Sequence, residues 1–461
     1  MKKSTSAAIL IILLISMAVG TGTAFGQGFG LSWDSGLTVA NLTDVDAQIV
    51  ITFYPQSGSE VVYQPADPVP GNGSLKFFPL DMLDDGFNGS AVISSDQPIA
   101  ATVNQLTTGG GGSYEGLSAG SLEATLPIIM RANGGYNTTF NIQNAGDDTA
   151  EVYISFTPAT YGSADTDGPF SIEPGRALTF DQSEDTELGS RFVGSALITS
   201  DVPIVAAVNQ VNPDAKVILS YRGFTSGSPT VALPTIQSAN SDYYTGIAVK
   251  NVGEDCTTVT VTFGPNTVAG STFDPVPEEQ ADVCEGESVN FNQWGGQWTS
   301  RYVGSATVSN SADMPLVVNV NQLRMAGVRQ GSAYSGFDPS GATLEIVVPT
   351  LMAFNGGYSS GFLVQNVSGT GATATFTVTY STSAGTYTNP VDEIATDIAD
   401  GAGYNFRQFV GQWTAADQNN SQRWVGSAVV QCSQPCVAVV NQLKLSGATA
   451  DTLLTYTGVN K

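Results

Sequence analysis

An all-β chain made of four tandem domains is the prediction from this sequence, and three observations support it. One stretch recurs four times with small changes, as in "RFVGSALITSDVPIVAAVNQV" (Arg191–Val211). Within each copy, apolar and polar residues alternate with a period of two, which is typical of half-buried strands. Gly, Pro, Asn and Asp separate the apolar runs, and helical spacing is nowhere sustained.

The first residues read as a secretory signal peptide. Lys2 and Lys3 precede an apolar run from Ala7 to Val19, and small residues follow it. A short membrane anchor is the alternative, but the run falls below the roughly 18 residues that a spanning helix needs. We therefore expect cleavage after residue 26, no membrane span after cleavage, and a secreted protein that associates with the cell surface.

Four sets of markers divide the rest of the chain. The Asn-Gln pair ends the repeated stretch, and its glutamines Gln105, Gln210, Gln322 and Gln442 are spaced by 105, 112 and 120 residues. A second marker is an asparagine at Asn41, Asn144, Asn251 and Asn366, and a third is the tyrosine at Tyr114, Tyr221, Tyr334 and Tyr456. A proline at Pro127, Pro234 and Pro349 opens the later units. These spacings indicate whole domains: residues 1–26 as the signal peptide, then 27–124, 125–231, 232–346 and 347–461.

Strand counting within one unit predicts its fold. In the second unit we expect strands near 125–131, 137–145, 149–158, 170–173, 176–182, 192–200, 203–211 and 216–223. Seven or eight short strands in roughly 100 residues match an immunoglobulin-like β-sandwich. The last two strands before the closing one are expected to form a hairpin with "SDVP" as its turn. Gly194 in the first of them indicates a bulge or a close approach of two backbones.

The Asn-Gln pair ends an apolar strand, where buried side-chain amides need partners. One interpretation is structural: the amides bond backbone at the sandwich end or at the junction between domains. The other is that they line a ligand site repeated in each unit. We favour the structural interpretation because the pair occurs in every unit, whereas the loops that could hold a ligand differ between units.

Charge and composition exclude several classes of function. The formal net charge is −25, so nucleic acid and anionic membranes would be repelled. The chain has no His, which excludes Ser-His-Asp and Cys-His catalysis and His-ligated zinc. Carboxylate pairs are of no diagnostic value among 41 acidic residues. A fourfold repeat also argues against one specialised active site, so we expect a protein that is not an enzyme and that carries no cofactor, calcium excepted.

The four cysteines fall into two repeats. Secretion permits disulfides, so pairing within each repeat is expected: Cys256 with Cys284, and Cys432 with Cys436. A cysteine-ligated metal site is the alternative, but the chain has no C-x-x-C motif.

Two weaker candidates for ligand sites remain. Calcium is suggested by "DTDG", with Asp165 and Asp167, and by the acidic run "DQSEDTE", with Asp181, Glu184 and Asp185, although solvated loop acids would look the same. Carbohydrate binding is suggested by Trp294, Trp298 and Trp413 in Gly/Gln/Asn-rich loops. The alternative for these tryptophans is that they cap the core or a neighbouring domain.

Taken with these repeats, the "GSA…P…VNQ" stretch and the "QNxG" strand end resemble those of exported bacterial proteins with tandem immunoglobulin-like repeats. That resemblance covers nearly all of the chain after residue 26 and implies a surface, adhesion or matrix role. It transfers no functional residue. The expected function is a secreted structural or adhesive protein of the cell surface or matrix, with a carbohydrate-binding surface protein as the alternative. Its candidate partners are copies of itself, other surface proteins or a glycan.

The first unit departs from the pattern in a way that bears on assembly. In units two to four the proline precedes the marker asparagine by 17 residues, and the same count back from Asn41 ends at Ala24. Cleavage would therefore remove the opening strand of the first unit and leave an open sheet edge. Strand addition from another chain could then build a filament or layer. The alternative is that the segment from Gly28 to Trp33 folds back and covers this edge itself.

Overall fold

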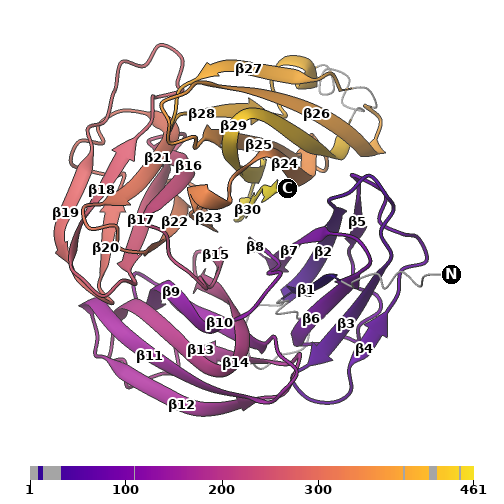
Figure 1. Ribbon diagram of the computed structural model, residues 1–461, viewed down its shortest axis with the longest axis vertical. Coiled ribbons are helices and arrows are strands. Elements are labelled where there is room, and N and C mark those ends of the chain that lie inside the picture. The colour runs from indigo at the N-terminus through magenta and orange to yellow at the C-terminus, as the bar shows by residue number, and fades with distance from the viewer. Residues whose placement is uncertain (1–8, 14–32, 108, 388–389, 415–422, 446–447) are drawn as a thin grey trace.

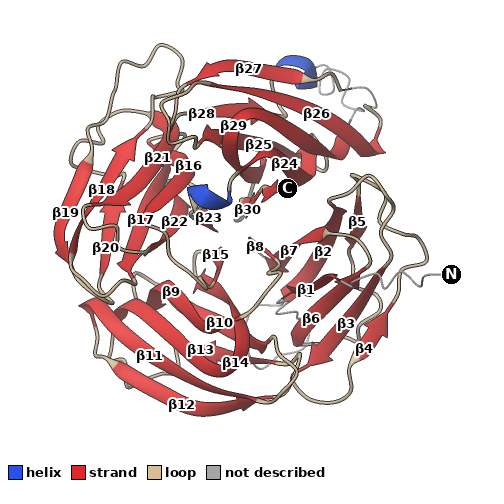
Figure 2. Ribbon diagram, in the orientation of Figure 1, coloured by secondary structure: helices blue, strands red, loops and turns tan. Residues whose placement is uncertain are grey.

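The computed structural model describes residues 9–13, 33–107, 109–387, 390–414, 423–445 and 448–461. These ranges are all-β, with two short 3-10 turns, η1 (Pro339–Gly341) and η2 (Gly411–Trp413). Figure 2 shows strands following one another through the described parts of the chain. None of the described residues belongs to a helix with the length and apolar character that crossing a membrane requires.

The third unit shows the arrangement of strands within a unit. Its strands are β16 (Thr230–Ser238), β17 (Tyr243–Asn251), β18 (Thr257–Phe263), β19 (Glu278–Val283), β20 (Ser288–Asn292), β21 (Tyr302–Asn310), β22 (Leu316–Arg324) and β23 (Gln330–Ser335). They form two antiparallel sheets, with the orders β16-β21-β18-β19 and β20-β17-β22-β23. Strand β18 alternates as the sequence suggests, because Val259 and Val261 are buried while Thr260 between them is more exposed.

The other units repeat this arrangement. The first unit has β1 (Ile9–Leu13), β2 (Trp33–Asn41), β3 (Ile49–Pro55), β4 (Val61–Tyr63), β5 (Ser74–Phe77), β6 (Gly89–Ser95), β7 (Ile99–Thr107) and β8 (Gly111–Glu115). The second has β9 (Ser121–Arg131), β10 (Asn137–Asn144), β11 (Ala150–Tyr161), β12 (Asp165–Ile172), β13 (Ala177–Asp181), β14 (Phe192–Asn212) and β15 (Val217–Arg222). The fourth has β24 (Thr343–Ala353), β25 (Tyr358–Asn366), β26 (Ala374–Gly385), β27 (Glu393–Ile398), β28 (Gly403–Arg407), β29 (Trp424–Lys444), β30 (Leu454–Thr457) and β31 (Val459–Asn460).

The repeated stretch is not a hairpin, so that prediction was wrong. In the second unit it forms the single strand β14, whose first half pairs with β9 and β11 and whose second half pairs with β10 and β15. In the third unit the same halves are β21 and β22, which belong to different sheets. The chain therefore crosses from one sheet to the other at "SDVP", because each half has its pairing partners in other strands.

Buried apolar side chains form four clusters, each drawn mainly from one unit. In the third unit, Val231 and Leu233 from one sheet pack with Val318 and Val320 from the other. The clusters also extend across the boundaries between units. Val205 and Ala207 of the second unit belong to the first unit's cluster, and Val439 of the fourth belongs to the third's. The units are therefore joined by apolar burial as well as by the chain.

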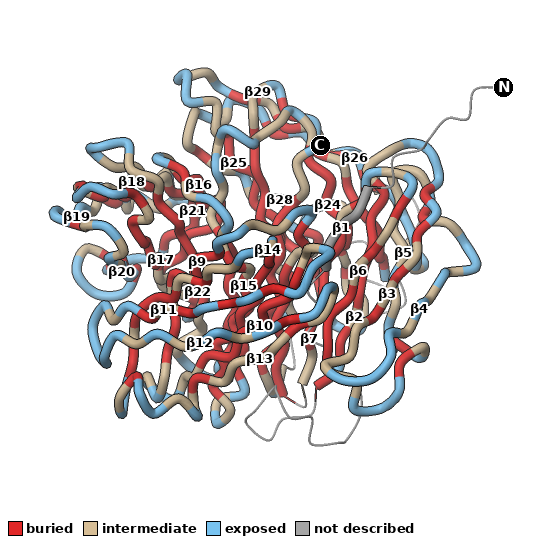
Figure 3. The backbone as a smooth tube through the Cα atoms, turned by 60° about the horizontal axis from the view of Figure 1, so that its bottom comes forward, coloured by how far each residue is buried: buried red, intermediate tan, exposed pale blue. Residues whose placement is uncertain are grey.

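The four units form a closed ring (Figure 1). Strands β8, β15, β23 and β30 lie nearest its centre and contact one another, whereas β4, β12, β19 and β27 lie at the rim. Figure 3 shows buried residues along the strands and exposed ones mainly in the outer loops. Between the fourth and first units, the backbone N–H of Thr457 donates to the Glu115 carboxylate, and Ser74 Oγ donates to the Pro349 carbonyl at 3.4 Å.

The edge of β6 is covered by β1, which pairs with it antiparallel from Ile9 opposite Ser95 to Leu13 opposite Ala91. Strand β1 takes the place that β16 has beside β21 in the third unit. It lies within the predicted signal peptide. The predicted cleavage region and the segment from Gly28 up to Trp33, expected to fold back, lie outside the described residues except for Trp33 itself.

Candidate functional site

The marker asparagines hold the loop at the end of a strand in every unit. Each one donates through Nδ2 to two backbone carbonyls and accepts a backbone N–H two residues on through Oδ1. In the second unit, Asn144 Nδ2 donates to Asp148 and Ile172 at 2.7 and 2.8 Å, and its Oδ1 accepts from Gly146 at 2.8 Å. The same pattern occurs at Asn41, Asn251 and Asn366. Both N–H donors and the acceptor oxygen of these buried amides are used, which is what burial of an amide requires.

The Asn-Gln pair links neighbouring units. Gln210 of the second unit and Asn321 of the third exchange hydrogen bonds in both directions, at 3.0 and 3.3 Å. Gln322 of the third unit and Asn441 of the fourth do the same, at 2.9 and 3.0 Å. At these two junctions the amides lie between the domains, as the structural interpretation expects, but they bond one another rather than backbone.

The "GSA" residues also lie where backbones or units meet. A β-carbon added at Gly194 would lie 2.2 Å from the Thr157 carbonyl oxygen, so Gly194 is needed for a close approach of two strands. The serine that follows contacts the next unit. Ser305 Oγ donates to the Gly401 carbonyl at 2.7 Å, and Ser195 Oγ accepts from Lys250 Nζ at 2.7 Å.

At the centre of the ring, Asp451 contacts all four units. Its carboxylate accepts the backbone N–H of Ile218 at 3.4 Å and of Gly331 at 3.1 Å, from the second and third units. It also accepts the N–H of Leu453 in its own unit, and its own N–H donates to the Gly109 carbonyl of the first. Burial raises the pKa of Asp451 well above its usual value, although these backbone N–H groups favour the charged form.

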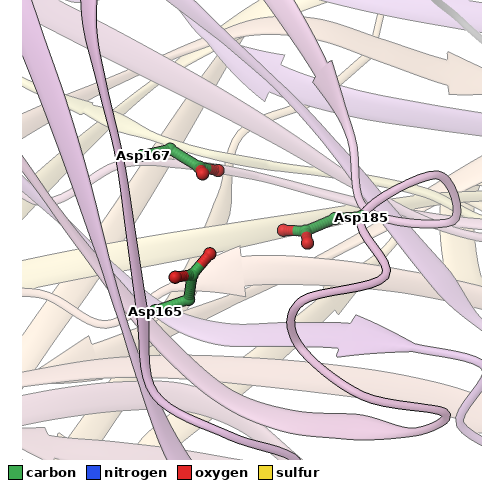
Figure 4. A group of neighbouring side chains, drawn as sticks. All are labelled: Asp165, Asp167 and Asp185. Carbon is green, nitrogen blue, oxygen red and sulfur yellow. The ribbon is translucent and has the colours of Figure 1, made fainter.

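The acidic residues suggested for calcium are only partly brought together. One carboxylate oxygen from each of Asp165, Asp167 and Asp185 lies within 4.8 Å of the other two (Figure 4). Burial and then the charges of the other acids raise the pKa of Asp167. Asp181 accepts from the N–H and hydroxyl of Ser183, and neither Asp181 nor Glu184 belongs to this group. Three converging carboxylates suit a hard cation such as Ca²⁺ in chemistry but supply fewer ligands than it normally takes.

Two of the three candidate tryptophans cannot stack on a ligand, which corrects that expectation. Trp298 and Trp413 are buried in the cores of their units, and their indole N–H groups donate to Glu278 and Glu393 at 2.8 and 2.9 Å. Burying the ring while bonding its one polar atom is the usual role of a core tryptophan. Trp294 differs, because 37% of it is exposed.

The cysteines pair as expected, Cys256 with Cys284 and Cys432 with Cys436. The first bridge joins the start of β18 to the turn after β19. The second lies within β29, where the chain crosses between the sheets, so it does not staple a hairpin.

A cleft of about 620 Å³ opens between the third and fourth units. Sequence reasoning missed it, because its walls come from loops and strands of two repeats. Arg301, Asn240 and Gln237 line one side, and Arg407, Tyr404 and Phe409 line the other. None of the lining residues is acidic. The cleft has the size of a small-molecule site, with aromatic and apolar walls and a few polar groups.

Polar groups continue from this cleft into the junction. Asn240 Nδ2 donates to Gln237 Oε1 at 2.6 Å, and Gln237 Nε2 donates to Gln322 Oε1 at 2.8 Å. Gln322 then bonds Asn441, which also lines the cleft. Thr235, 1% exposed, also lines the cleft, and its hydroxyl finds no hydrogen-bond partner among the described residues; the same holds for the buried Oδ1 of Asn405. Unpartnered buried oxygens of this kind call for a donor, such as water or a ligand hydroxyl.

Comparison with known proteins adds little to this description. No protein-family model matches the chain, and no curated protein matches it. A solved structure titled "Crystal Structure of Thermotoga maritima 1070" is similar at 20% identity over 23% of this chain and 94% of its own, with a TM-score of 0.19. A likeness at this level carries no argument about function.

Proposed function

We propose that this chain is a secreted, non-enzymatic structural or adhesive protein that acts as a preassembled ring at the cell surface or in the extracellular matrix. In this proposal, residues 1–26 are a signal peptide and each unit is an immunoglobulin-like β-sandwich. The observation that supports this proposal is that the repeated residues have structural roles. The asparagine loop contacts, the amide pairs and the "GSA" residues hold the units and their junctions, and none of them is arranged around a reacting group.

The cleft between units three and four also supports a role in binding without catalysis. Its lining includes two arginines, amides, hydroxyls and aromatic rings, but no carboxylate, cysteine or lysine. Hydroxyl groups such as those of Ser241 and Tyr404 can act as a nucleophile or an acid, but the lining supplies no carboxylate, lysine or histidine to activate them. As the second candidate function we propose carbohydrate binding at this cleft, in place of Trp298 and Trp413.

Self-assembly belongs to the same proposal, and β6 is the edge it would use. Removal of residues 1–26 takes away β1, which leaves the backbone groups on one side of β6 without that partner. Strand β30, the last but one, is less suited to a head-to-tail contact, because it already packs against β8 within the ring.

The experiment exposes insoluble cell-envelope and matrix material to the purified secreted chain. Retention on the pellet and release of reducing ends or amines into the supernatant are measured together. We expect retention without product. Product that increases with time and protein would overturn the non-enzymatic assignment, and failure to be retained on any such material would overturn the adhesive one.

A further inference from the structure

Three units place an aromatic side chain over a glycine at the surface that faces the preceding unit. A β-carbon added at Gly36, Gly246 or Gly361 would lie 3.3, 3.2 or 3.8 Å from the ring of Phe78, Trp294 or Phe409. These pairs occupy matching positions on β2, β17 and β25. Because glycine has no side chain, each ring can lie against the strand and keep a face open, and Phe78 and Trp294 are 59% and 37% exposed.

Phe409 is the member of this set that lines the cleft between units three and four. Tyr404, which is 42% exposed, lines it as well. The apolar C–H face of a sugar ring packs on aromatic rings of this kind. The side-chain amides of Asn240, Asn405 and Asn441 lie in the same cleft, where their accessible atoms can exchange hydrogen bonds with sugar hydroxyls.

The two arginines add a preference for negative charge. Within the described residues the ion pairs are Arg176 with Glu173 and Lys461 with Glu345, so neither Arg301 nor Arg407 is neutralised by a carboxylate. Arg301 donates through Nε to Asn240 Oδ1 at 2.9 Å, which fixes its position at the cleft. On a chain of net charge −25, a cleft with two arginines and no acid is a local exception. Planar guanidinium groups match the geometry of a carboxylate.

We propose that the cleft between units three and four binds a uronic-acid oligosaccharide, with its carboxylates on Arg301 and Arg407 and a ring face on Phe409. This inference rests on the second candidate function above and names its ligand class. The protein's overall negative charge acts against the approach of an acidic polymer, but at physiological salt that field decays within about 8 Å. Short-range pairing inside the cleft can therefore decide binding.

The test is calorimetric titration of the secreted chain with trigalacturonic acid and, separately, with its neutral methyl ester. We expect binding of the acid, and binding of the ester that is weaker by roughly 10- to 100-fold, because each charge-assisted hydrogen bond contributes about 1.5–3 kcal/mol. R407Q should lower the affinity for the acid by a similar factor. F409A should lower the affinity for the acid and for the ester alike, since it removes the aromatic ring on which the sugar would stack.

Arg191 gives a matched control. It occupies the position of Arg301 in the second unit and likewise bonds an asparagine, Asn133, but lies outside this cleft. R191Q should leave the affinity unchanged, and thermal melts of all variants check that they fold. Equal affinity for the acid and the ester, equal losses in R191Q and R407Q, or no binding of either sugar would overturn the proposal. Retention of the protein on matrix material in the same preparation would show that only this inference, and not the proposed adhesive function, had failed.

Discussion

Two junctions of the ring can be compared, the one between units two and three and the one between units three and four. They share the same central contact and differ in the residues that surround it. Both have a reciprocal amide pair, Gln210 with Asn321 and Gln322 with Asn441. At the second junction the amides continue through Gln237 to the cleft, whereas the first has no such extension in the bonds made by Gln210. The repeated residues therefore build both junctions, and residues that differ between repeats, such as Gln237 and Arg407, contribute to the cleft at only one of them.

Removing the disulfides should have the largest effect on stability, and the effect should differ between the two units. Loop-closure entropy predicts a loss of about 3.6 kcal/mol for the paired variant C256S/C284S, whose bridge spans 28 residues of sequence. For C432S/C436S, which spans 4 residues, it predicts about 2 kcal/mol. Chemical denaturation of each variant measures both values. An equal or reversed ranking would show that the local strand crossing matters more than the loop it closes.

Breaking the amide pairs should distinguish the two junctions. We expect Q322A to cost about 2–3 kcal/mol, because it leaves Gln237, Asn441 and Thr455 without one partner each in a buried site. Q210A removes partners from Asn321 alone and should cost about 1–2 kcal/mol. Urea unfolding monitored by tryptophan fluorescence compares them. If Q210A proved the more damaging, the extended network at the second junction would not be a source of stability.

Lys250 provides a third comparison, because it stands where the second and fourth units have Gln143 and Gln365. Burial lowers its pKa to about 8, although Nζ donates to Ser195 Oγ and to the Gly286 carbonyl. The folded state therefore disfavours the charged form, and the stability of the parent should rise as the pH increases from about 8 to the unfolded pKa near 10.4. K250Q should lack this rise.

The measurement for Lys250 is the difference in melting temperature between K250Q and the parent at pH 7 and at pH 9.5. We expect the melting temperature of K250Q to be higher, relative to the parent, at pH 7 than at pH 9.5, where this difference should disappear. A difference that does not change with pH would mean that the ammonium group is well solvated at this junction.

The smallest expected effect concerns the acidic group in the second unit. Without divalent cations, D185N should raise the melting temperature by a degree or two, roughly the effect of a few tenths of a kcal/mol, because it removes repulsion from Asp165 and Asp167. With millimolar CaCl₂ the parent should be stabilised and D185N should not. D181N, which alters a carboxylate outside the group, is the control. Calcium stabilisation that survives in D185N would place any bound ion elsewhere.

Period-two alternation was enough to predict an all-β chain, and the second unit's expected strands match most of those observed. The hairpin was wrong because alternation reports which face a residue occupies and does not report which strand it pairs with. The aromatic residues show the same limit. Trp294 and Trp298 lie four residues apart in one polar loop. Trp294 is partly exposed beside Gly246, whereas Trp298 is buried and donates a hydrogen bond to Glu278.

The cleft could not have been predicted from a single unit. Arg301 and Arg407 are far apart in sequence and do not occupy matching positions in their repeats. They line the same cleft only because the ring sets the third unit's loops beside the fourth unit's sheet. One sequence signal did exist, since Trp294 and Phe409 hold equivalent positions, but the chain gives no sign of which of them borders an open cleft.

The closed ring is the central claim, and small-angle X-ray scattering of the chain without residues 1–26 tests it most directly. A compact particle of this length should have a radius of gyration of about 22–23 Å when the data are extrapolated to zero protein concentration. Four domains of roughly 110 residues joined in an open row would instead give about 40 Å. A value close to 22–23 Å is the result this account predicts, and a value near that of the open row would contradict it.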